Sequence, residues 1–135
     1  QPRRLLTFAI DGKKKLPEAV PPDMKIHAVD DPELVLDEAD IAAGRALSVR
    51  CAACHGVGFY SPGTPGPDLR ESQLALKLED FKQVVTSGAL LEQGMPKFDM
   101  LSDDEIRQLH AYLRARAREA LGKRKESKAA PMPQL

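Results

Sequence analysis

The sequence predicts a small helical domain over residues 36–122, because three segments of that region carry helical signals. These segments run from about residue 37 to 50, from about 74 to 86 and from about 103 to 121. Between the first two lies the pentapeptide Cys51-Ala52-Ala53-Cys54-His55, which carries the strongest chemical signal in the chain. Outside residues 36–122, prolines and runs of like charge predict extended chain rather than a packed core.

The first helix is expected to begin at Asp37 or Asp40, because either carboxylate can accept hydrogen bonds from the free backbone N–H groups of a helix N-terminus. Gly44 lies inside this helix, where glycine costs about 1 kcal/mol relative to alanine. Either the position lets another helix approach closely, or it is a tolerated weak point.

The pentapeptide is typical of a c-type haem attachment site. The thiols of Cys51 and Cys54 can each form a thioether to one vinyl group of the porphyrin. The imidazole of His55 can then bind the iron from the proximal side. The two small alanines are expected to keep a tight turn that lets the backbone approach the ring.

Three other interpretations of the cysteines are weaker. A thioredoxin-like redox pair needs an α/β context that this chain lacks. A zinc site needs a second Cys or Cys/His pair to complete four ligands, and the chain has only two cysteines. A plain disulfide leaves His55 without a role.

Two loops separate the predicted helices. Residues 56–70 are rich in glycine and proline and are suited to lie flat against a porphyrin face and edge. The second helical segment follows, with Phe81, Val84 and Val85 as apolar residues and Gly88 as its stop. Residues 94–98 form the second loop.

The third helix opens with a capping box, in which Ser102 is the N-cap and Glu105 lies three residues on. Apolar residues then recur on one helical face. They are Ile106, Leu109, Tyr112, Leu113 and Ala117. Gly122 is expected to end this helix, and residues 123–135 are expected to form a basic, solvated tail.

Met95 is the preferred candidate for the second axial ligand of the iron. It lies in a Gly-Met-Pro loop that lets its sulfur point inward, and His/Met ligation is typical of cytochromes c. Met100 is the alternative, although it can simply be a core residue beside Leu101. The other methionines and histidines are weaker candidates, since they lie in a linker, in the tail or, on the last helix, at the boundary of its apolar face: Met24, His27, Met132 and His110.

The N-terminal residues have a different character. Residues 5–10 read as a strand with Leu6, Phe8 and Ile10 on one face, and an Asp11-Gly12 turn follows. A lone strand cannot satisfy its own backbone hydrogen bonds, and no second strand follows the turn. The segment is either a strand from the sheet of another domain or an extension over the surface. Residues 18–35 are expected to form an extended, solvated, proline-rich linker that wraps over a neighbour.

Composition sets further bounds on the chain. Only 4% of the 135 residues are aromatic and tryptophan is absent, so a buried haem would supply apolar mass that the side chains lack. The formal net charge of zero gives no signal for a nucleic acid or an anionic membrane as partner. No apolar run is long enough to span a bilayer. Because haem c is attached outside the bacterial cytoplasm, we expect a periplasmic protein made as a secreted precursor.

Together these residues resemble a class I cytochrome c from about residue 36 to 121. The matching features are the helix with Gly44, the C-A-A-C-H motif, G-P-D-L at 66–69, G-M-P at 94–96 and the final helix. The resemblance implies an all-α fold of three to five helices around one covalently bound haem c, with an extended N-terminal segment. It implies that the Pro67 carbonyl accepts a hydrogen bond from Nδ1–H of His55, and that Gly44 lies where the first and last helices cross.

A narrower resemblance covers nearly the whole chain. L-L-T-F-A-I-D-G-K-K-K-L-P at 5–17 is similar to the closing strand of the β-propeller in PQQ-dependent quinohaemoprotein alcohol dehydrogenases, and G-P-D-L-R and G-M-P-K-F resemble their cytochrome domain. This implies a remnant propeller strand at 1–17, a linker at 18–35 and a cytochrome domain at 36–122. PQQ would belong to the absent catalytic domain. Arg70 would pair with a haem propionate, although an arginine that faces solvent is equally compatible with the residues.

The function predicted from these features is one-electron transfer, with no substrate chemistry in this chain. By resemblance, electrons would come from reduced PQQ in a dehydrogenase domain and pass to an external acceptor such as a small copper protein or another cytochrome. The alternatives are a free-standing electron shuttle, which leaves the N-terminal strand unexplained, and a haem enzyme or gas sensor. The last needs an open distal site, which Met95 argues against.

Overall fold

The computed structural model describes residues 9–13, 15 and 25–129 of the chain. The described part contains four α-helices: α1 (Glu38–Leu47), α2 (Val49–His55), α3 (Leu78–Ser87) and α4 (Asp103–Ala129). Three short 3₁₀ turns connect them: η1 (Val57–Phe59), η2 (Leu69–Glu71) and η3 (Leu91–Gln93). No strand occurs among the described residues, so the all-α prediction is confirmed for that part of the chain.

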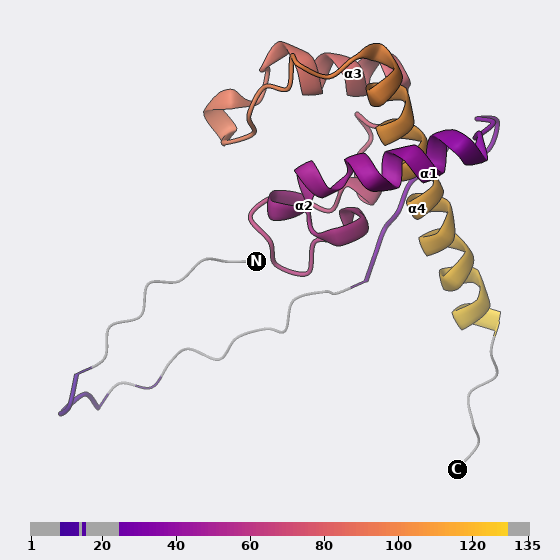
Figure 1. The fold of residues 1–135 in the computed structure, drawn as a ribbon. Coiled ribbons are helices and arrows are strands. Elements are labelled where there is room, and N and C mark those ends of the chain that lie inside the picture. Colours follow the sequence, from indigo (N-terminus) through magenta and orange to yellow (C-terminus); the bar gives the residue numbers. More distant parts are fainter. Residues whose placement is uncertain (1–8, 14, 16–24, 130–135) are drawn as a thin grey trace.

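Helices α1 and α4 cross at a steep angle and make the main helix contact of the domain (Figure 1). At the crossing, a Cβ atom added to Gly44 would lie 1.9 Å from the backbone oxygen of Gln108 and 2.9 Å from Cβ of Tyr112. Such distances leave no room for any side chain, so of the two interpretations of Gly44 the close helix contact is correct. An Arg107–Asp40 ion pair of 2.9 Å joins the same two helices at the surface.

The hydrophobic core lies between α4, α3 and the loops that follow α2. From α4 it takes the predicted apolar face, including Ile106, Leu109 and Leu113, none of which is more than 1% exposed. Phe81 and Val85 come from α3, and other members come from the loops. The apolar face predicted for the third helix is therefore the face of α4 that is buried.

The helix ends follow the capping signals closely. The side chain of Asp37 accepts hydrogen bonds from the N–H groups of Ala39 and Asp40, so Asp37 is the N-cap of α1. Ser102 and Glu105 form the predicted capping box: the N–H of Glu105 donates to Oγ of Ser102 at 3.2 Å, and the N–H of Ser102 donates to the Glu105 carboxylate at 2.9 Å. Gly88 ends α3 in the left-handed conformation, with φ of 78°.

Two local predictions are wrong. The C-A-A-C-H motif is helical, in α2, rather than a tight turn. Helix α4 does not end at Gly122 but continues through it to Ala129. The reason is local, because the residues that follow Gly122 are mostly good helix formers such as Lys, Arg and Glu, and an isolated glycine in a helix costs only about 1 kcal/mol.

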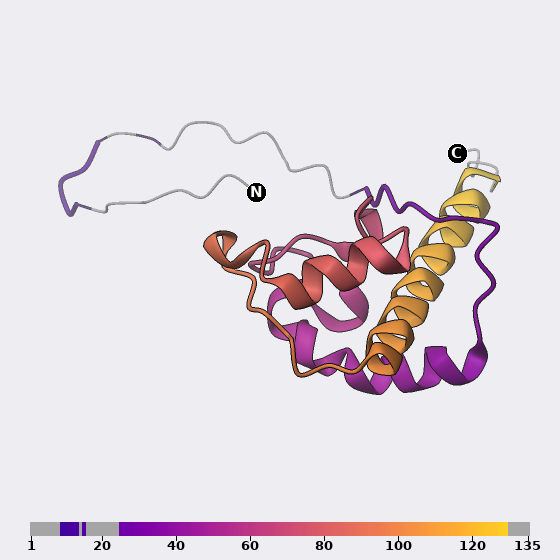
Figure 2. The ribbon, with the colours of Figure 1, turned by 90° about the horizontal axis from the view of Figure 1, so that it is seen from above.

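Residues 27–34, here called the strap, run along α4 and lead into the N-terminus of α1 (Figure 2). The strap is extended, as predicted, but it packs on the helical domain instead of being solvated. Ala28 is buried, the N–H of Val29 donates to the carbonyl of Arg70 at 2.9 Å, and Arg118 binds both the Asp30 carboxylate and the carbonyl of Asp31. The packed unit therefore begins before residue 36.

The predicted strand at residues 5–10 lies mostly outside the described residues, and so do residues 18–24 of the predicted linker. The predicted Asp11-Gly12 turn lies within them, where the N–H of Gly12 donates to the carbonyl of Ala9 at 3.1 Å. Within the described part of the chain, no helix is both long and apolar enough to span a bilayer.

Replacement of Gly44 by alanine should destabilise the protein by roughly 1–3 kcal/mol, because the added methyl group must push α1 away from the backbone of α4. Gly122→Ala is the matched control, since no atom lies within 4 Å of its added Cβ and alanine favours a helix. Urea unfolding curves of the two variants should shift in opposite directions. Equal stability of Gly44→Ala and wild type would contradict the close helix contact.

Deletion of residues 1–35 should lower the thermal midpoint, because it removes the strap and leaves the buried Arg114 and the partly buried Arg118 without their backbone acceptors. Deletion of residues 1–24 keeps the strap and is the matched control. Scanning calorimetry of the two truncated proteins should place the shorter deletion near wild type and the longer one well below it. Equal midpoints would show that the strap contributes nothing to the fold.

Candidate haem site

Helix α2 carries three of the predicted site residues. Cys51 and Cys54 are three residues apart in the helix, so they lie on one side of it. Both are free thiols; Cys54 is exposed and Cys51 is partly buried. Burial raises the pKa of the Cys51 thiol above its ordinary value, which keeps it protonated near neutral pH.

His55 is the last residue of α2, and its side chain is buried. Its Nδ1 lies 2.8 Å from the carbonyl oxygen of Pro67, the contact that the family resemblance implies. This hydrogen bond fixes the orientation of the ring and leaves Nε2 as the nitrogen that can bind a metal. Gly66 packs directly against the ring, because a Cβ added there would lie 2.8 Å from Nδ1.

The loop that carries Pro67 is held by Asp68. The Asp68 carboxylate accepts hydrogen bonds from the backbone N–H groups of Ser61 and Arg70, and it forms an ion pair with the Arg70 guanidinium at 2.6 Å. Burial alone would raise the pKa of Asp68, but these donors outweigh it and hold the pKa below its ordinary value. Asp68 is therefore ionised near neutral pH and keeps the loop in one conformation.

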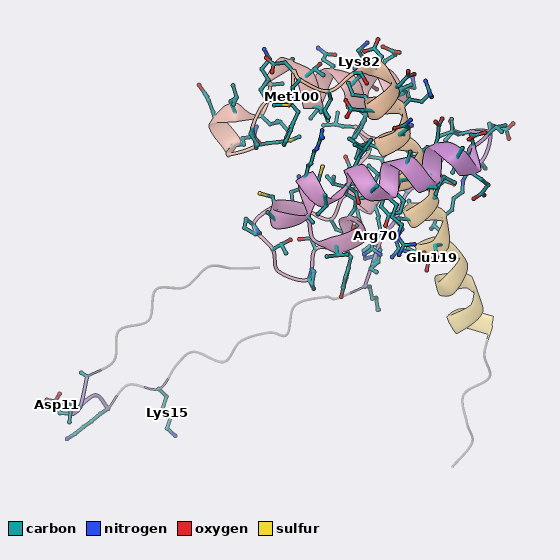
Figure 3. All side chains as sticks on the ribbon, viewed as in Figure 1. Asp11, Lys15, Arg70, Lys82, Met100 and Glu119 are labelled. Carbon is teal, nitrogen blue, oxygen red and sulfur yellow. The ribbon has the colours of Figure 1, made fainter. Side chains whose placement is uncertain are left out.

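Arg70 is buried, so it does not face solvent. Its guanidinium binds Asp68 and lies over the ring of Tyr60, 4.8 Å from the centroid (Figure 3). Arg70 is absent from the residues that line the cavity described next. A pairing of Arg70 with a haem propionate stays a prediction.

A cavity of about 430 Å³ lies beside α2, between the loops and α3. Cys51, Cys54, His55 and Pro67 line one part of it, and Met95 also lines it. The remaining lining is mostly apolar and includes Phe59, Leu69, Phe81, Val85, Leu101 and Leu109. The cavity therefore brings together four predicted haem contacts of the attachment region and the predicted methionine.

The two candidate methionines lie in different surroundings. Met95 packs against the hydrophobic core and lines the cavity. Its N–H donates to the carbonyl of Leu90 at 3.1 Å, which holds the start of the Gly-Met-Pro loop. Met100, which is labelled in Figure 3, is 68% exposed and is not among the residues that line the cavity. The alternative that Met100 is a core residue is wrong, because Leu101 takes the buried position next to it.

His110 is buried rather than a boundary residue of α4. Its Nε2 lies 3.0 Å from the carbonyl oxygen of Ala75, and its ring lies against that of Phe81. Burial lowers the pKa of His110, so the ring is neutral near pH 7. His110 does not line the cavity, nor does His27 of the strap. Met24 and Met132 lie outside the described residues.

Sequence reasoning gave no role to Gly66, Asp68 or Arg114. The G-P-D-L segment was a signal for the first two, because its rigid, acidic sequence suits an organised loop. The signal for Arg114 was its place four residues after His110 and four before Arg118, on a helical stripe beside the apolar face.

The residues around the cavity fit a haem c. Two free thiols lie on one side of α2, and an imidazole with a fixed Nδ1 follows them. A thioether and an apolar wall complete the donor set and the lining. A zinc site has less support, since no group of three or more His, Cys, Asp or Glu residues within the described ranges is placed to hold a metal ion.

Comparison with known proteins agrees with this chemistry. The sequence profile of the family described as "Cytochrome C oxidase, cbb3-type, subunit III" matches residues 39–113, which include α1, α2, the cavity and the start of α4. More than half of the chain is thus covered by one family, and every predicted axial and attachment residue lies inside the match.

Three curated relatives share most of the chain. The "Quinohemoprotein alcohol dehydrogenase ADH IIB" of Pseudomonas putida is 42% identical over 115 residues, 84% of this chain and 16% of its own length. The "Lupanine 17-hydroxylase [cytochrome c]" of a Pseudomonas species is 37% identical and matches over 86% of this chain and 16% of its own. The "Alcohol dehydrogenase (quinone), dehydrogenase subunit" of Gluconobacter oxydans (strain 621H) is 33% identical, over 87% of this chain and 15% of its own. The chain thus spans about a sixth of these much longer proteins.

Proposed function

Because the chain belongs to the cytochrome c family, we propose that it transfers single electrons through one haem c attached to Cys51 and Cys54. In this proposal the imidazole of His55 and the thioether of Met95 would hold the iron. The observation that carries it is the cavity, which joins the two thiols and the imidazole of α2 to the thioether of a distant loop. A bound haem supplies the cycle between Fe(II) and Fe(III).

The protein's own residues set the conditions for that cycle. The Pro67 carbonyl holds Nδ1–H of His55 and so makes the imidazole a stronger donor. The thioether of Met95 favours Fe(II) and raises the reduction potential. The apolar lining keeps water from the ligands, and the rigid loop around Asp68 limits movement of the proximal side.

We further propose that the chain is the cytochrome domain of a PQQ-dependent alcohol dehydrogenase. Two relatives are named as alcohol dehydrogenases with a quinone or a quinohemoprotein character, and each is several times longer than this chain. Electrons would pass from reduced PQQ in a preceding domain to the haem, and then to a small copper protein or another cytochrome. The periplasm is the compartment that suits this relay.

A protein that contains this chain and the proposed dehydrogenase domain should show haem reduction when alcohol is added. Acid–acetone extraction should leave haem on the polypeptide, as its intact mass would show.

A Cys51→Ala, Cys54→Ala double variant should lose the attached haem, and with it the ability to reduce a cytochrome acceptor. It should still reduce a dye that takes electrons directly from the quinone. Acceptor reduction at the wild-type rate without haem would contradict the relay.

Met95→Ala should abolish the weak far-red absorption band of a ferric His/Met haem and lower the reduction potential, because the thioether that stabilises Fe(II) is removed. The ferrous variant should also bind carbon monoxide readily at neutral pH. Met100→Ala is the matched control and should change neither property, since that side chain is exposed and outside the cavity. The reverse pattern would assign the ligand to Met100, and easy carbon monoxide binding by wild type would favour an enzyme or sensor.

A further inference from the structure

Arg114 is a fully buried cation that the electron-transfer site does not use directly. Its side chain is 0% exposed, on the part of α4 that the strap covers. Nη1 donates to the carbonyl of Val29 at 3.0 Å, and Nη2 donates to the carbonyl of Leu69 at 3.4 Å. Nε is buried and has no hydrogen-bond partner among the described residues. Burial lowers the pKa of Arg114, while the charge of Asp30 opposes that shift.

The two carbonyls that Arg114 binds belong to segments far apart in the sequence. Val29 lies in the strap, and Leu69 begins η2, two residues after Pro67. A backbone hydrogen bond from the N–H of Val29 to the carbonyl of Arg70 joins the same two segments at 2.9 Å. Arg114 thus clamps the strap and η2 together, with the guanidinium as the bridge.

This clamp acts on the loop that orients the axial histidine. The Pro67 carbonyl accepts the Nδ1–H bond of His55 at 2.8 Å. Asp68, between Pro67 and Leu69, caps η2 through the N–H of Arg70. Displacement of η2 would therefore move the Pro67 carbonyl and weaken its hydrogen bond to His55. The hydrogen bond at Nδ1 of a metal-binding histidine sets how strongly the imidazole donates to the metal.

We propose that Arg114 is a positioning residue for the axial histidine, which it serves by holding Leu69 against the strap so that the Pro67 carbonyl stays on His55 Nδ1. The proposal rests on the proposed haem ligation by His55. A guanidinium is suited to the task, because its planar fork can donate to two carbonyls at once and keeps its charge when buried. A lysine ammonium at this position is a compact point charge that lacks the planar fork, so its donors are not held one on each carbonyl.

The test measures the reduction potential of the haem-loaded protein for Arg114→Lys, Arg118→Lys and Arg107→Lys. Arg118 binds the strap through Asp30 and Asp31, and within the described part of the chain it makes no hydrogen bond or ion pair with η2. Arg107, also on α4, forms ion pairs at the surface with Asp104 of the same helix and with Asp40 of α1. The three variants make the same chemical change at the clamp, at the strap alone and at the surface.

Arg114→Lys should raise the potential, because a looser Pro67 contact makes His55 a weaker donor and stabilises Fe(III) less. Exchange of the His55 Nδ1 proton with solvent, followed by NMR, should become faster in the same variant. Arg118→Lys should lower the thermal midpoint and leave the potential at the wild-type value. Arg107→Lys should leave the potential unchanged.

Several results would overturn the proposal. If Arg114→Lys lowers only the thermal midpoint, Arg114 is a purely structural residue. If Arg114→Lys lowers the potential, the buried lysine has become neutral, and the lost positive charge outweighs the change in the Pro67 contact with His55. If Arg118→Lys shifts the potential equally, the strap as a whole is responsible. A wild-type protein with no reversible haem couple would instead refute the proposed function.

A variant that does not fold still leaves the proposal open to test. Arg114→Gln keeps one amide donor group and is the second variant. In the reduced wild-type protein, NMR should show Arg114 guanidinium protons that exchange slowly and give contacts to both the Val29 and Leu69 segments. Rapid exchange, or contacts to only one segment, would refute the clamp.

Discussion

The approach of α1 to α4 at Gly44 is the constraint on which the haem site depends. A side chain at this position would overlap the backbone of Gln108, so only glycine lets the two helices cross at this distance. Ser48 alone separates the end of α1 from the start of α2. The crossing therefore determines where α2 lies, and with it Cys51 and His55. A backbone contact remote from the thiols and the imidazole thus decides whether they face one cavity.

Much of the fold could be predicted because its signals are local. Asp37, Ser102 with Glu105, and Gly88 act within one or two helical turns of their own positions, and the structure confirms each of them. Gly44 was open to two interpretations, and the packing of α4 against it decides between them. The C-A-A-C-H motif predicted a haem c site, since few other uses fit that spacing, and the match to a cytochrome c family supports it. Its helical conformation was missed because the motif alone does not say how it continues α1.

The features that could not be predicted depend on contacts between distant segments. The strap is polar and contains Pro32, which describes a solvated linker as well as a chain that binds the side chains of Arg114 and Arg118. Nothing local in Arg114 shows that it bridges Val29 and Leu69, which are far apart in the sequence. The extension of α4 beyond Gly122 is a different case, because two weak local preferences compete there. Glycine favours the end of a helix, whereas the residues after it favour its continuation, and the helix continues.

Because the chain has few aromatic residues, the stability of the domain depends in part on what fills the cavity. Only 4% of the residues are aromatic, and several apolar side chains that line the cavity stay exposed or partly exposed, including Leu69, Leu74 and Phe98. A haem held there would bury the faces of these side chains that border the cavity, which contributes roughly 25 cal/mol for each Å² removed from water. Free energy of this kind is gained only in the folded state, so haem binding and folding are coupled. The residues that would orient the proposed ligands therefore belong to the same cooperative unit as the core. Helix α4 contributes to both, with Leu109 and Leu113 in the core and Arg114 bound to the loop that follows Pro67.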